Sequence, residues 1–260
     1  MDPLSDQNPL VRLIRRAAAR GSLTEDGCAI AEGFHLVEEA IAARCDIRAV
    51  LATSLDPRFP DAKLVTGKTF RSLAATETPQ GILALVKPPE FAIDSITGQS
   101  GALAIVLDGV QDPGNAGSIV RAADAFGATG VIFLKGSVNP YNSKCIRASA
   151  GSIFRLPVVT GAALEDLGGI ALYAAMPRAE KLIDEADFIP PCAIVIGSEG
   201  HGVRAEVAAR ATGLRIPTSH VESLNAAVAA GVLLYEARRQ RDAHQKHKPE
   251  RHAQERPGAR

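Results

Sequence analysis

Apolar runs alternate with helical patterns through the second half of the chain, and this alternation limits its possible folds more than any other feature. Residues 102–110, ALAIVLDGV, form a continuous apolar run of the kind that is buried on both faces of a parallel sheet. A helical pattern of small and apolar residues follows at 115–127. Further strand-like runs follow at 130–136, 170–176 and 192–200. The alternation predicts an α/β domain with a mostly parallel sheet.

The N-terminal third of the chain shows a shorter version of this pattern. Asn8, Pro9 and Gly21 bracket a predicted helix at 9–20, since Asn is a favoured N-cap, Pro fits the first turn and Gly commonly ends a helix. Strand-like runs lie at 28–33, 47–52 and 81–89, and helical runs lie at 34–43 and 67–75. These elements predict a second, smaller α/β domain.

Segment 88–101, PPEFAIDSITGQSG, is rich in turn-forming residues and has no clear periodicity. We therefore expect a first domain at 1–96, with 88–101 as the linker, and a second domain at 97–241. Residues 242–260 have almost no apolar content, which predicts a disordered tail.

The composition excludes several classes of protein. The 260 residues are 46% hydrophobic and 22% charged, which argues against intrinsic disorder, collagen and coiled coil for most of the chain. No apolar run approaches the length of a membrane span and the N-terminus lacks a secretory signal, so we expect a cytoplasmic protein with no membrane contact. The four cysteines are widely spaced, which predicts reduced thiols and no metal site.

The charge balance at first argues against a nucleic-acid partner. The chain has 29 basic and 29 acidic side chains, and aromatic residues make up only 4%. Contact with nucleic acid would therefore depend on local basic clusters. Arg12, Arg15, Arg16 and Arg20 form one such cluster, because helix positions three, four and eight apart share a face. A solvated helix face is the alternative.

Three polar, glycine-rich segments lie where strands are expected to end, which is the usual place for a ligand crevice in an α/β sheet. The first, 108–121, reads DGVQDPGNAGSIVR, and its Pro-Gly turn opens a helix. Backbone N–H groups and Asn115 at the start of this helix suit an anionic group. Arg121 lies less than two turns further along.

The second segment, 194–203, reads IVIGSEGHGV, and its glycines allow close approach of the backbone to a ligand around one carboxylate, Glu199. The order matches neither the dinucleotide fingerprint, the P-loop nor the nucleophile elbow. A Rossmann-type oxidoreductase is therefore discounted.

In the third segment, 214–237, a predicted short strand ends at Pro217, and a polar loop then leads into a long Ala-rich helix. Tight packing within the chain or between two copies would explain the small residues at 226–231. It would not explain Ser223 and Asn225, which precede them.

Together and in this order, the three segments resemble the motifs of the SpoU-type (TrmH-like) RNA ribose 2′-O-methyltransferases of the SPOUT superfamily. Those motifs read D-x-x-x-D-P-x-N-x-G-x-I-x-R, then G-x-E-x-x-G, then I-P followed by S-L-N-x-x-V-A. The resemblance covers 102–241. It extends more weakly to 8–89, which looks like the family's RNA substrate-binding domain, similar to ribosomal protein L30e, with Pro79-Gln80-Gly81 near its end.

The resemblance implies an α/β trefoil-knot domain that forms a homodimer and uses S-adenosylmethionine without a metal. The motif match places the cofactor at Gly197, Ile216 and Leu224. It places the active site at Asn115, Arg121, Glu199, Ser223 and Asn225, with Arg121 serving a pocket completed by the other subunit.

Segment 139–152 resembles a family segment that lines the RNA side of the pocket. It adds Arg147 to Arg12, Arg15 and Arg16 as candidate RNA contacts, with a capped helix bearing solvated charges as the alternative. The chain departs from many relatives at Ala226-Ala227, which removes a hydroxyl, and in a shorter loop at 217–221.

The expected function is methyl transfer from S-adenosylmethionine to a ribose 2′-hydroxyl of RNA, with 23S rRNA as the expected substrate. A tRNA 2′-O-methyltransferase and a non-catalytic RNA-binding ribosome-assembly protein of the same fold are the alternatives. The hydroxyl is a poor nucleophile, so its proton needs an acceptor. The resemblance implies the arginine, Arg121, as the acceptor. A guanidinium stays protonated, however, so positioning of the hydroxyl or of a phosphate by Arg121 is an equal alternative to base catalysis. Glu199 could orient Arg121 or accept the proton.

Overall fold

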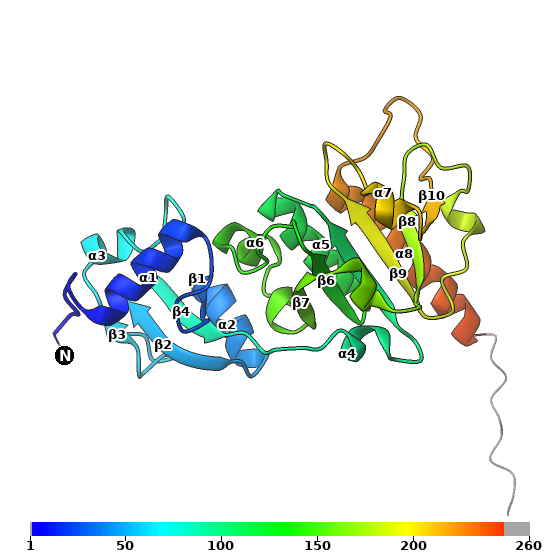
Figure 1. Cartoon of the computed structure of the whole chain (residues 1–260). Coiled ribbons are helices and arrows are strands. Elements are labelled where there is room, and N and C mark those ends of the chain that lie inside the picture. The colour runs from blue at the N-terminus through cyan, green and yellow to red at the C-terminus, as the bar shows by residue number, and fades with distance from the viewer. Residues whose placement is uncertain (1, 247–260) are drawn as a thin grey trace, which may run out of the picture.

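The computed structural model describes residues 2–246 and has two lobes that lie side by side, each built on its own sheet (Figure 1). The N-terminal lobe contains four strands, β1 (Ala29–Glu32), β2 (Asp46–Ala52), β3 (Lys63–Leu64) and β4 (Ile82–Lys87). Their order is β1-β4-β2-β3, with β4 antiparallel to both neighbours and β2 parallel to β3. This lobe is a small α/β unit.

The helices of this lobe are α1 (Pro9–Arg20), α2 (Phe34–Ala42) and α3 (Gly67–Arg71). The predicted ends of α1 are confirmed. The Asn8 side chain accepts a hydrogen bond from Leu10 N at 3.0 Å, and Gly21 ends the helix in the left-handed conformation with φ 58°. Val11 and Ile14 are fully buried against the sheet, so the face opposite the core carries the arginines.

The second lobe contains six strands, all parallel. They are β5 (Leu103–Asp108), β6 (Gly130–Leu134), β7 (Val158–Ala162), β8 (Ala171–Ala175), β9 (Cys192–Gly197) and β10 (Thr212–Leu214). The order is β10-β8-β9-β5-β6-β7. The chain therefore builds outward from β5 to β7, crosses to β8, and returns to place β9 beside β5. The pair β5 and β9 is the point where the strand order reverses.

Helices cover both faces of this sheet. They are α4 (Asp94–Thr97), α5 (Pro113–Ala125), α6 (Ser143–Ala148), α7 (Ala205–Ala208) and α8 (Ala226–Lys246), with short 3₁₀ turns η1 (Ser152–Phe154), η2 (Leu164–Leu167) and η3 (Ile183–Glu185). Leu103 and Ile105 of β5 pack on the side of α5 and α8, while Ala104 and Val106 pack on the side of α4, α7 and η2. Burial on both faces explains why β5 reads as a continuous apolar run.

The two lobes share one apolar core. Buried residues of β1, α2 and β4 belong to the same cluster as buried residues of β5, α5 and α8. Arg155 adds an ion pair between the lobes, since its guanidinium pairs with Glu39 of α2 in the N-terminal lobe. It also pairs with Asp124 of α5 in the second lobe. The Cys45 thiol donates to the carbonyl oxygen of Phe154 at 3.7 Å.

Two features differ from the sequence-based expectation. Helix α8 continues to Lys246, so 242–246 is helical where a disordered tail was predicted. Arg241 stabilises this end of the helix, because its guanidinium donates hydrogen bonds to the carbonyl oxygens of Gly101, Ala102, Phe188 and Pro190. Helix α4, within the predicted linker, packs Ile96 into the core of the second lobe. The rest of the predicted tail, 247–260, lies outside the described residues.

Two smaller differences concern short strands and turns and the end of one helix. The 3₁₀ turns, β3 and β7 were not predicted, and α3 ends at Arg71, earlier than the predicted helix at 67–75. Within 2–246, no helix has the length and apolar character needed to cross a membrane.

Candidate functional site

The candidate site lies at the carboxyl edge of the six-stranded sheet, where β5 and β9 adjoin. Asp108 ends β5 and is paired in register with Gly197, which ends β9. The loop after β5 leads into α5, and the loop after β9 carries Glu199. In open α/β sheets, ligands bind at such a reversal of strand order because two loops diverge there and leave a crevice.

The start of α5 is fixed by a cap and an ion pair. The Asp112 side chain accepts a hydrogen bond from Asn115 N at 2.8 Å, and Pro113 occupies the first turn. Lys144 Nζ lies 2.8 Å from Asp112 Oδ2. The hydrogen bonds from Lys144 and from the backbone of Asn115 lower the pKa of Asp112. The carboxylate therefore stays ionised and holds the helix start, on which Asn115 sits.

Position 117, in the same segment, has room only for glycine. A Cβ at Gly117 would lie 2.2 Å from the carbonyl oxygen of Cys145, which is backbone of α6 and cannot move aside. Glycine is therefore required where α5 and α6 pack closely.

A chain of three side chains joins the segments predicted from sequence. Asn225 Nδ2 donates to Asn115 Oδ1 at 3.0 Å, and Asn115 Nδ2 donates to Glu199 Oε1 at 2.6 Å. Asn225 Oδ1 also accepts from the backbone N of Ala227 at 2.9 Å and of Val228 at 3.3 Å, so it caps α8. These bonds fix the orientation of both amides and hold one oxygen of the Glu199 carboxylate.

The Glu199 loop is a tight turn. Ser198 and Gly202 exchange backbone hydrogen bonds of 3.0 and 2.9 Å. The turn folds back over β9 so closely that a Cβ at Gly197 would lie 2.2 Å from the backbone of Gly202 and Val203. Glycine at 197 is therefore a geometric necessity.

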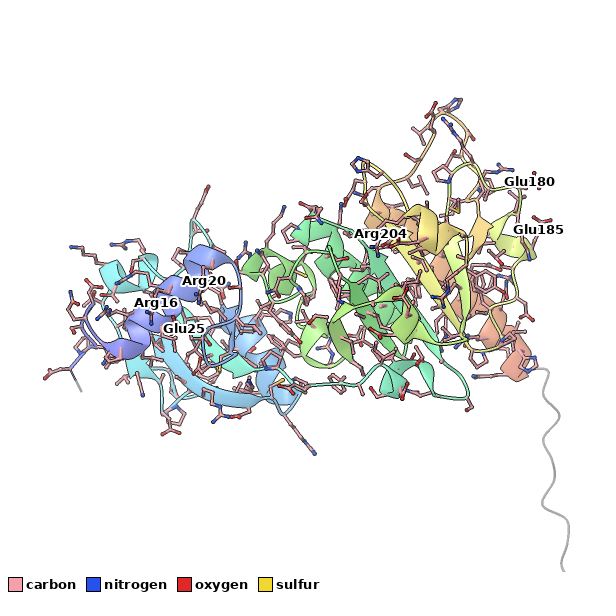
Figure 2. The ribbon with its side chains drawn as sticks, viewed as in Figure 1. Arg16, Arg20, Glu25, Glu180, Glu185 and Arg204 are labelled. Carbon is pink, nitrogen blue, oxygen red and sulfur yellow. The ribbon has the colours of Figure 1, made fainter. Side chains whose placement is uncertain are left out.

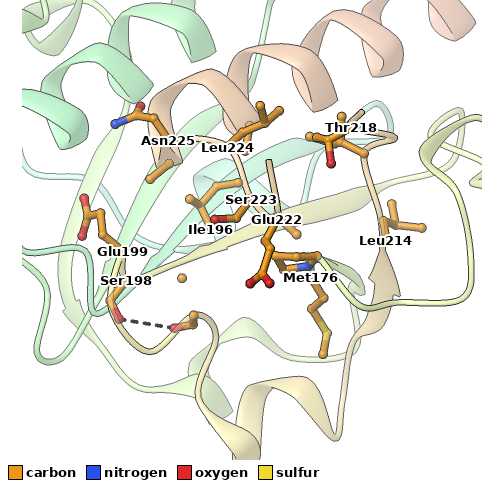
Figure 3. Close-up of a pocket in the computed structure, with 17 residues that line it drawn as sticks. Met176, Ile196, Ser198, Glu199, Leu214, Thr218, Glu222, Ser223, Leu224 and Asn225 are labelled. Carbon is orange, nitrogen blue, oxygen red and sulfur yellow. Dashed lines mark hydrogen bonds between the residues drawn. The ribbon is translucent and has the colours of Figure 1, made fainter. Parts of the chain in front are cut away.

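A cavity of about 430 Å³ opens beside this chain of side chains. Figure 3 shows Glu199 and Asn225 at one end and Leu214 and Met176 at the other. The lining combines apolar side chains, two carboxylates (Glu199 and Glu222) and loop backbone. Its volume lies in the range of about 300–1,000 Å³ that is usual for small-molecule and cofactor sites.

Comparison with known proteins gives the family. Residues 102–235, just over half of the chain, match the SpoU rRNA Methylase family. The chain belongs to the SpoU family. Residues 8–84 match the MRM3-like substrate binding domain, which corresponds to the N-terminal lobe.

Relatives of the SpoU family match over almost the whole chain. A protein of Synechocystis sp. named "uncharacterized tRNA/rRNA methyltransferase" is 36% identical over 256 residues, covering 91% of this chain and 93% of its own. The 23S rRNA (guanosine(2553)-2′-O)-methyltransferase RlmP of Bacillus subtilis is 30% identical over 249 residues, covering 90% and 98%. The crystal structure of the SpoU methyltransferase AviRb of Streptomyces viridochromogenes with AdoMet has a TM-score of 0.80 at 26% identity, covering 91% and 99%. The second lobe therefore has the SPOUT fold.

Most of the SpoU site residues predicted from sequence come together. Six of them line the cavity, namely Gly197, Glu199, Ile216, Ser223, Leu224 and Asn225. Asn115 does not line it but bonds to both Asn225 and Glu199. Arg121 is the exception, because it is exposed on α5 and its side chain has no hydrogen bond or ion pair within the described part of the chain.

The sequence reasoning missed several lining residues. Met176, Leu214, Thr218 and Glu222 all line the cavity. Met176 closes the strand-like run at 170–176, so the rule that ligands gather at the carboxyl ends of strands could have found it. Glu222 lies in a loop without a motif position, and nothing in the sequence marked it.

The candidate RNA-binding residues differ in their availability. Arg15 is held by Asp6 at 2.9 Å and by Ser72, and Arg16 lies 3.5 Å from Glu25. Arg12 is exposed, and its side chain has no hydrogen-bond or ion-pair partner among residues 2–246. Arg147 buries one guanidinium nitrogen, Nη1, that has no hydrogen-bond partner there. Arg16 and Arg20 lie on the N-terminal lobe, and Arg204 lies on the other lobe (Figure 2).

No metal-ligand cluster of three or more His, Cys, Asp or Glu side chains is found between residues 2 and 246. All four cysteines are free thiols within the described chain, and burial raises the pKa of each. The pKa of Cys145 reaches about 12, which leaves it protonated and unreactive at neutral pH.

Proposed function

We propose that this chain is an S-adenosylmethionine-dependent RNA methyltransferase that modifies a ribose 2′-hydroxyl of ribosomal RNA. The observation that carries the proposal is the Asn225–Asn115–Glu199 chain of hydrogen bonds beside a cofactor-sized cavity at the carboxyl ends of β8, β9 and β10. The names of the relatives support it, since RlmP and the RlmB of Xanthomonas campestris are both 23S rRNA guanosine 2′-O-methyltransferases.

The residues present fit S-adenosylmethionine. The apolar end of the cavity, with Met176, Leu214 and Leu224, suits the adenosine, and exposed loop backbone suits its polar edges. Glu199 and Glu222 are the charged side chains in the lining, and two carboxylates complement a ligand that carries a sulfonium and an ammonium. The structures of AviRb and of a Sinorhizobium meliloti rRNA methyltransferase, both with AdoMet, support this assignment.

The bound cofactor supplies a methyl group on a positively charged sulfur, which leaves as a neutral thioether. The ribose oxygen forms the new bond to the methyl carbon, and its proton must pass to a base. We assign that role to Glu199. Asn115 holds one oxygen of its carboxylate, which leaves the other free to take the proton. Arg121, whose guanidinium is always protonated, is assigned to positioning the hydroxyl or a phosphate.

Arg121 fits a role in a second subunit. It lies with Ser118 and Ala125 on the exposed face of α5. On the neighbouring α8, Val228 and Tyr235 are 52% and 57% exposed although both are apolar in character, and Tyr235 makes an edge contact with Phe126 next to α5. An exposed apolar face of this kind marks an association surface. The proposal is therefore a homodimer in which this face is covered and Arg121 reaches the partner's site.

The N-terminal lobe is assigned to RNA recognition. The match to a substrate binding domain supports this, and so does the exposed Arg12 on α1. A likeness of this lobe to ribosomal protein L30e and a cytoplasmic location, where rRNA is modified, belong to the same proposal.

The test is methyl transfer by the purified protein from labelled S-adenosylmethionine to total RNA from a strain that lacks its own copy of the gene. We expect label in rRNA, with 2′-O-methyl mapping giving the nucleotide, and loss of transfer in Glu199→Gln that saturating S-adenosylmethionine does not restore. Label in tRNA alone would redirect the proposal to tRNA. Absence of cofactor binding by calorimetry would favour a non-catalytic RNA-binding protein.

A further inference from the structure

We propose that Asp108 and Arg204 form a clamp that positions the Glu199 loop for methyl transfer. The inference rests on the proposed function, and both residues act as positioning residues because neither lines the cavity. The clamp joins the end of β5 to the residue just before α7, 96 positions apart in the sequence.

Asp108 holds both ends of the loop. Its backbone is paired with Gly197, which is the last residue before the loop. Its side chain is fully buried and accepts two hydrogen bonds from Arg204, one from the backbone N at 2.7 Å and one from Nε at 2.5 Å. The loop 198–203 is therefore fastened to a single residue at its beginning and at its end.

The loop between these anchors is stiff. Ser198 and Gly202 hydrogen-bond to each other, and Ser198 Oγ accepts from His201 N at 3.2 Å. The backbone of Gly202 packs directly on Gly197. A turn fixed internally in this way moves as one body, so a shift at either anchor displaces Glu199 and its bond to Asn115.

The chemistry of the clamp makes Arg204 hard to replace. A buried carboxylate requires a cation or several donors, and Arg204 supplies a charged donor and a backbone donor from one residue. Lysine offers a point charge without the planar geometry that directs Nε toward Oδ1. Arg204 also pairs with Glu206 at 2.9 Å, but that carboxylate is 62% exposed and provides a matched control.

The experiment compares Arg204→Met, Glu206→Gln and the double variant Asp108→Asn/Arg204→Met in the full chain. Three readouts are used, namely kcat and KM for RNA, the melting temperature, and hydrogen exchange of the amides at 198–203. For Arg204→Met we expect kcat to fall about 10- to 100-fold with little change in KM, since a displacement near 1 Å can cost about 10²-fold in rate. The loop amides should exchange faster. Glu206→Gln should match the wild type in all three readouts.

The double variant separates positioning from folding. Asp108 is the buried member of this pair, and its replacement by an amide in the double variant removes the unpaired buried charge that Arg204→Met alone would leave. We therefore expect its melting temperature to recover toward the wild-type value while kcat stays low and the loop exchanges fast. Recovery of kcat together with the melting temperature would overturn the proposal, as would wild-type kcat in Arg204→Met. If the wild type transfers no methyl group to RNA, the proposed function fails, whereas the exchange of the loop still reports on the clamp.

Discussion

Asn225 carries two separable tasks at the scale of the single residue. Its Oδ1 caps α8, and its Nδ2 orients Asn115. Asn225→Asp keeps an acceptor for the cap and loses the donor, so we expect near wild-type stability and a kcat lower by about 10- to 100-fold. Steady-state kinetics and thermal melting of the same preparation measure both effects.

Asn225→Ala is the comparison for that variant. It removes the cap as well, which should lower the free energy of unfolding by about 1 kcal/mol in addition to the loss of kcat. Equal stability of the two variants would show that the cap contributes nothing, and wild-type kcat in Asn225→Asp would contradict the orienting role of its amide.

Sequence alone could predict only those site positions where the local backbone geometry requires a particular residue type. Glycine at 117 and 197 is dictated by backbone contacts within the lobe, and an asparagine before the Ala-rich run is a helix cap, so these positions carry local signals. No local sequence signal marked Asp108 as a residue that positions the Glu199 loop. Its partner, Arg204, is 96 residues away, and no periodicity or turn rule relates the two.

At the scale of the element, a carboxylate on helix α8 should make the stability of the protein depend on pH. Glu236 is almost fully buried, and hydrogen bonds from Arg239 and Gln240 lower its pKa below the ordinary value of 4.5. Because the pKa is lower in the folded than in the unfolded state, its stabilising effect is present above about pH 4.5 and is lost as the pH falls through the folded-state pKa. Glu236→Gln should cost about 1–2 kcal/mol at pH 7.

The measurement is the melting temperature of wild type and Glu236→Gln between pH 3 and pH 7. The difference between the two proteins should shrink toward acid pH, because the wild-type carboxylate becomes protonated there. A difference that stays constant over this range would show that Glu236 does not titrate with folding. The comparison cancels the contribution of other carboxylates, such as Asp112, whose pKa is also lowered.

Elements with strong local signals were predicted well, and weak ones were not. Helix α1 has a cap, a proline and a terminal glycine, and its bounds match the prediction. The end of α8 was misplaced because its last turns are polar, and what holds them is the reach of Arg241 to carbonyl oxygens up to 140 residues away. Strand β3 has two residues and owes its place to pairing with β2, which no local pattern records.

For the whole molecule, the proposed composite site between two subunits predicts complementation. Arg121→Ala and Glu199→Gln should each be inactive alone. Mixed under conditions that allow subunit exchange, they should recover about a quarter of wild-type activity, because half of the dimers are mixed and each of these has one site with both residues intact. Ultracentrifugation should show a dimer. No recovery in a mixture with proven exchange would place Arg121 and Glu199 in the same subunit's site.

The seam between the lobes depends on apolar packing more than on charge. Phe154 is 3% exposed in the shared core, whereas Arg155 beside it is exposed and makes one ion pair across the seam, with Glu39, and one within its own lobe, with Asp124. Phe154→Ala should lower the free energy of unfolding by about 3–5 kcal/mol, and Arg155→Ala by less than about 1 kcal/mol. Urea unfolding should be followed by tyrosine fluorescence, which reports on the second lobe alone, and by circular dichroism, which reports on both lobes. The two signals should give one coincident transition, and separate transitions would contradict a shared core.

The order of strands in the larger sheet also has a consequence during biosynthesis. The centre of that sheet is the pairing of β5 with β9, which begins 89 residues further along the chain at Cys192. At translation rates of roughly 5–20 residues per second, β5 waits several seconds for one of its two neighbours. Through that interval a strand that is apolar from Leu103 to Leu107 has one open edge, so the nascent second lobe is a natural client for chaperones until its C-terminal third has been made.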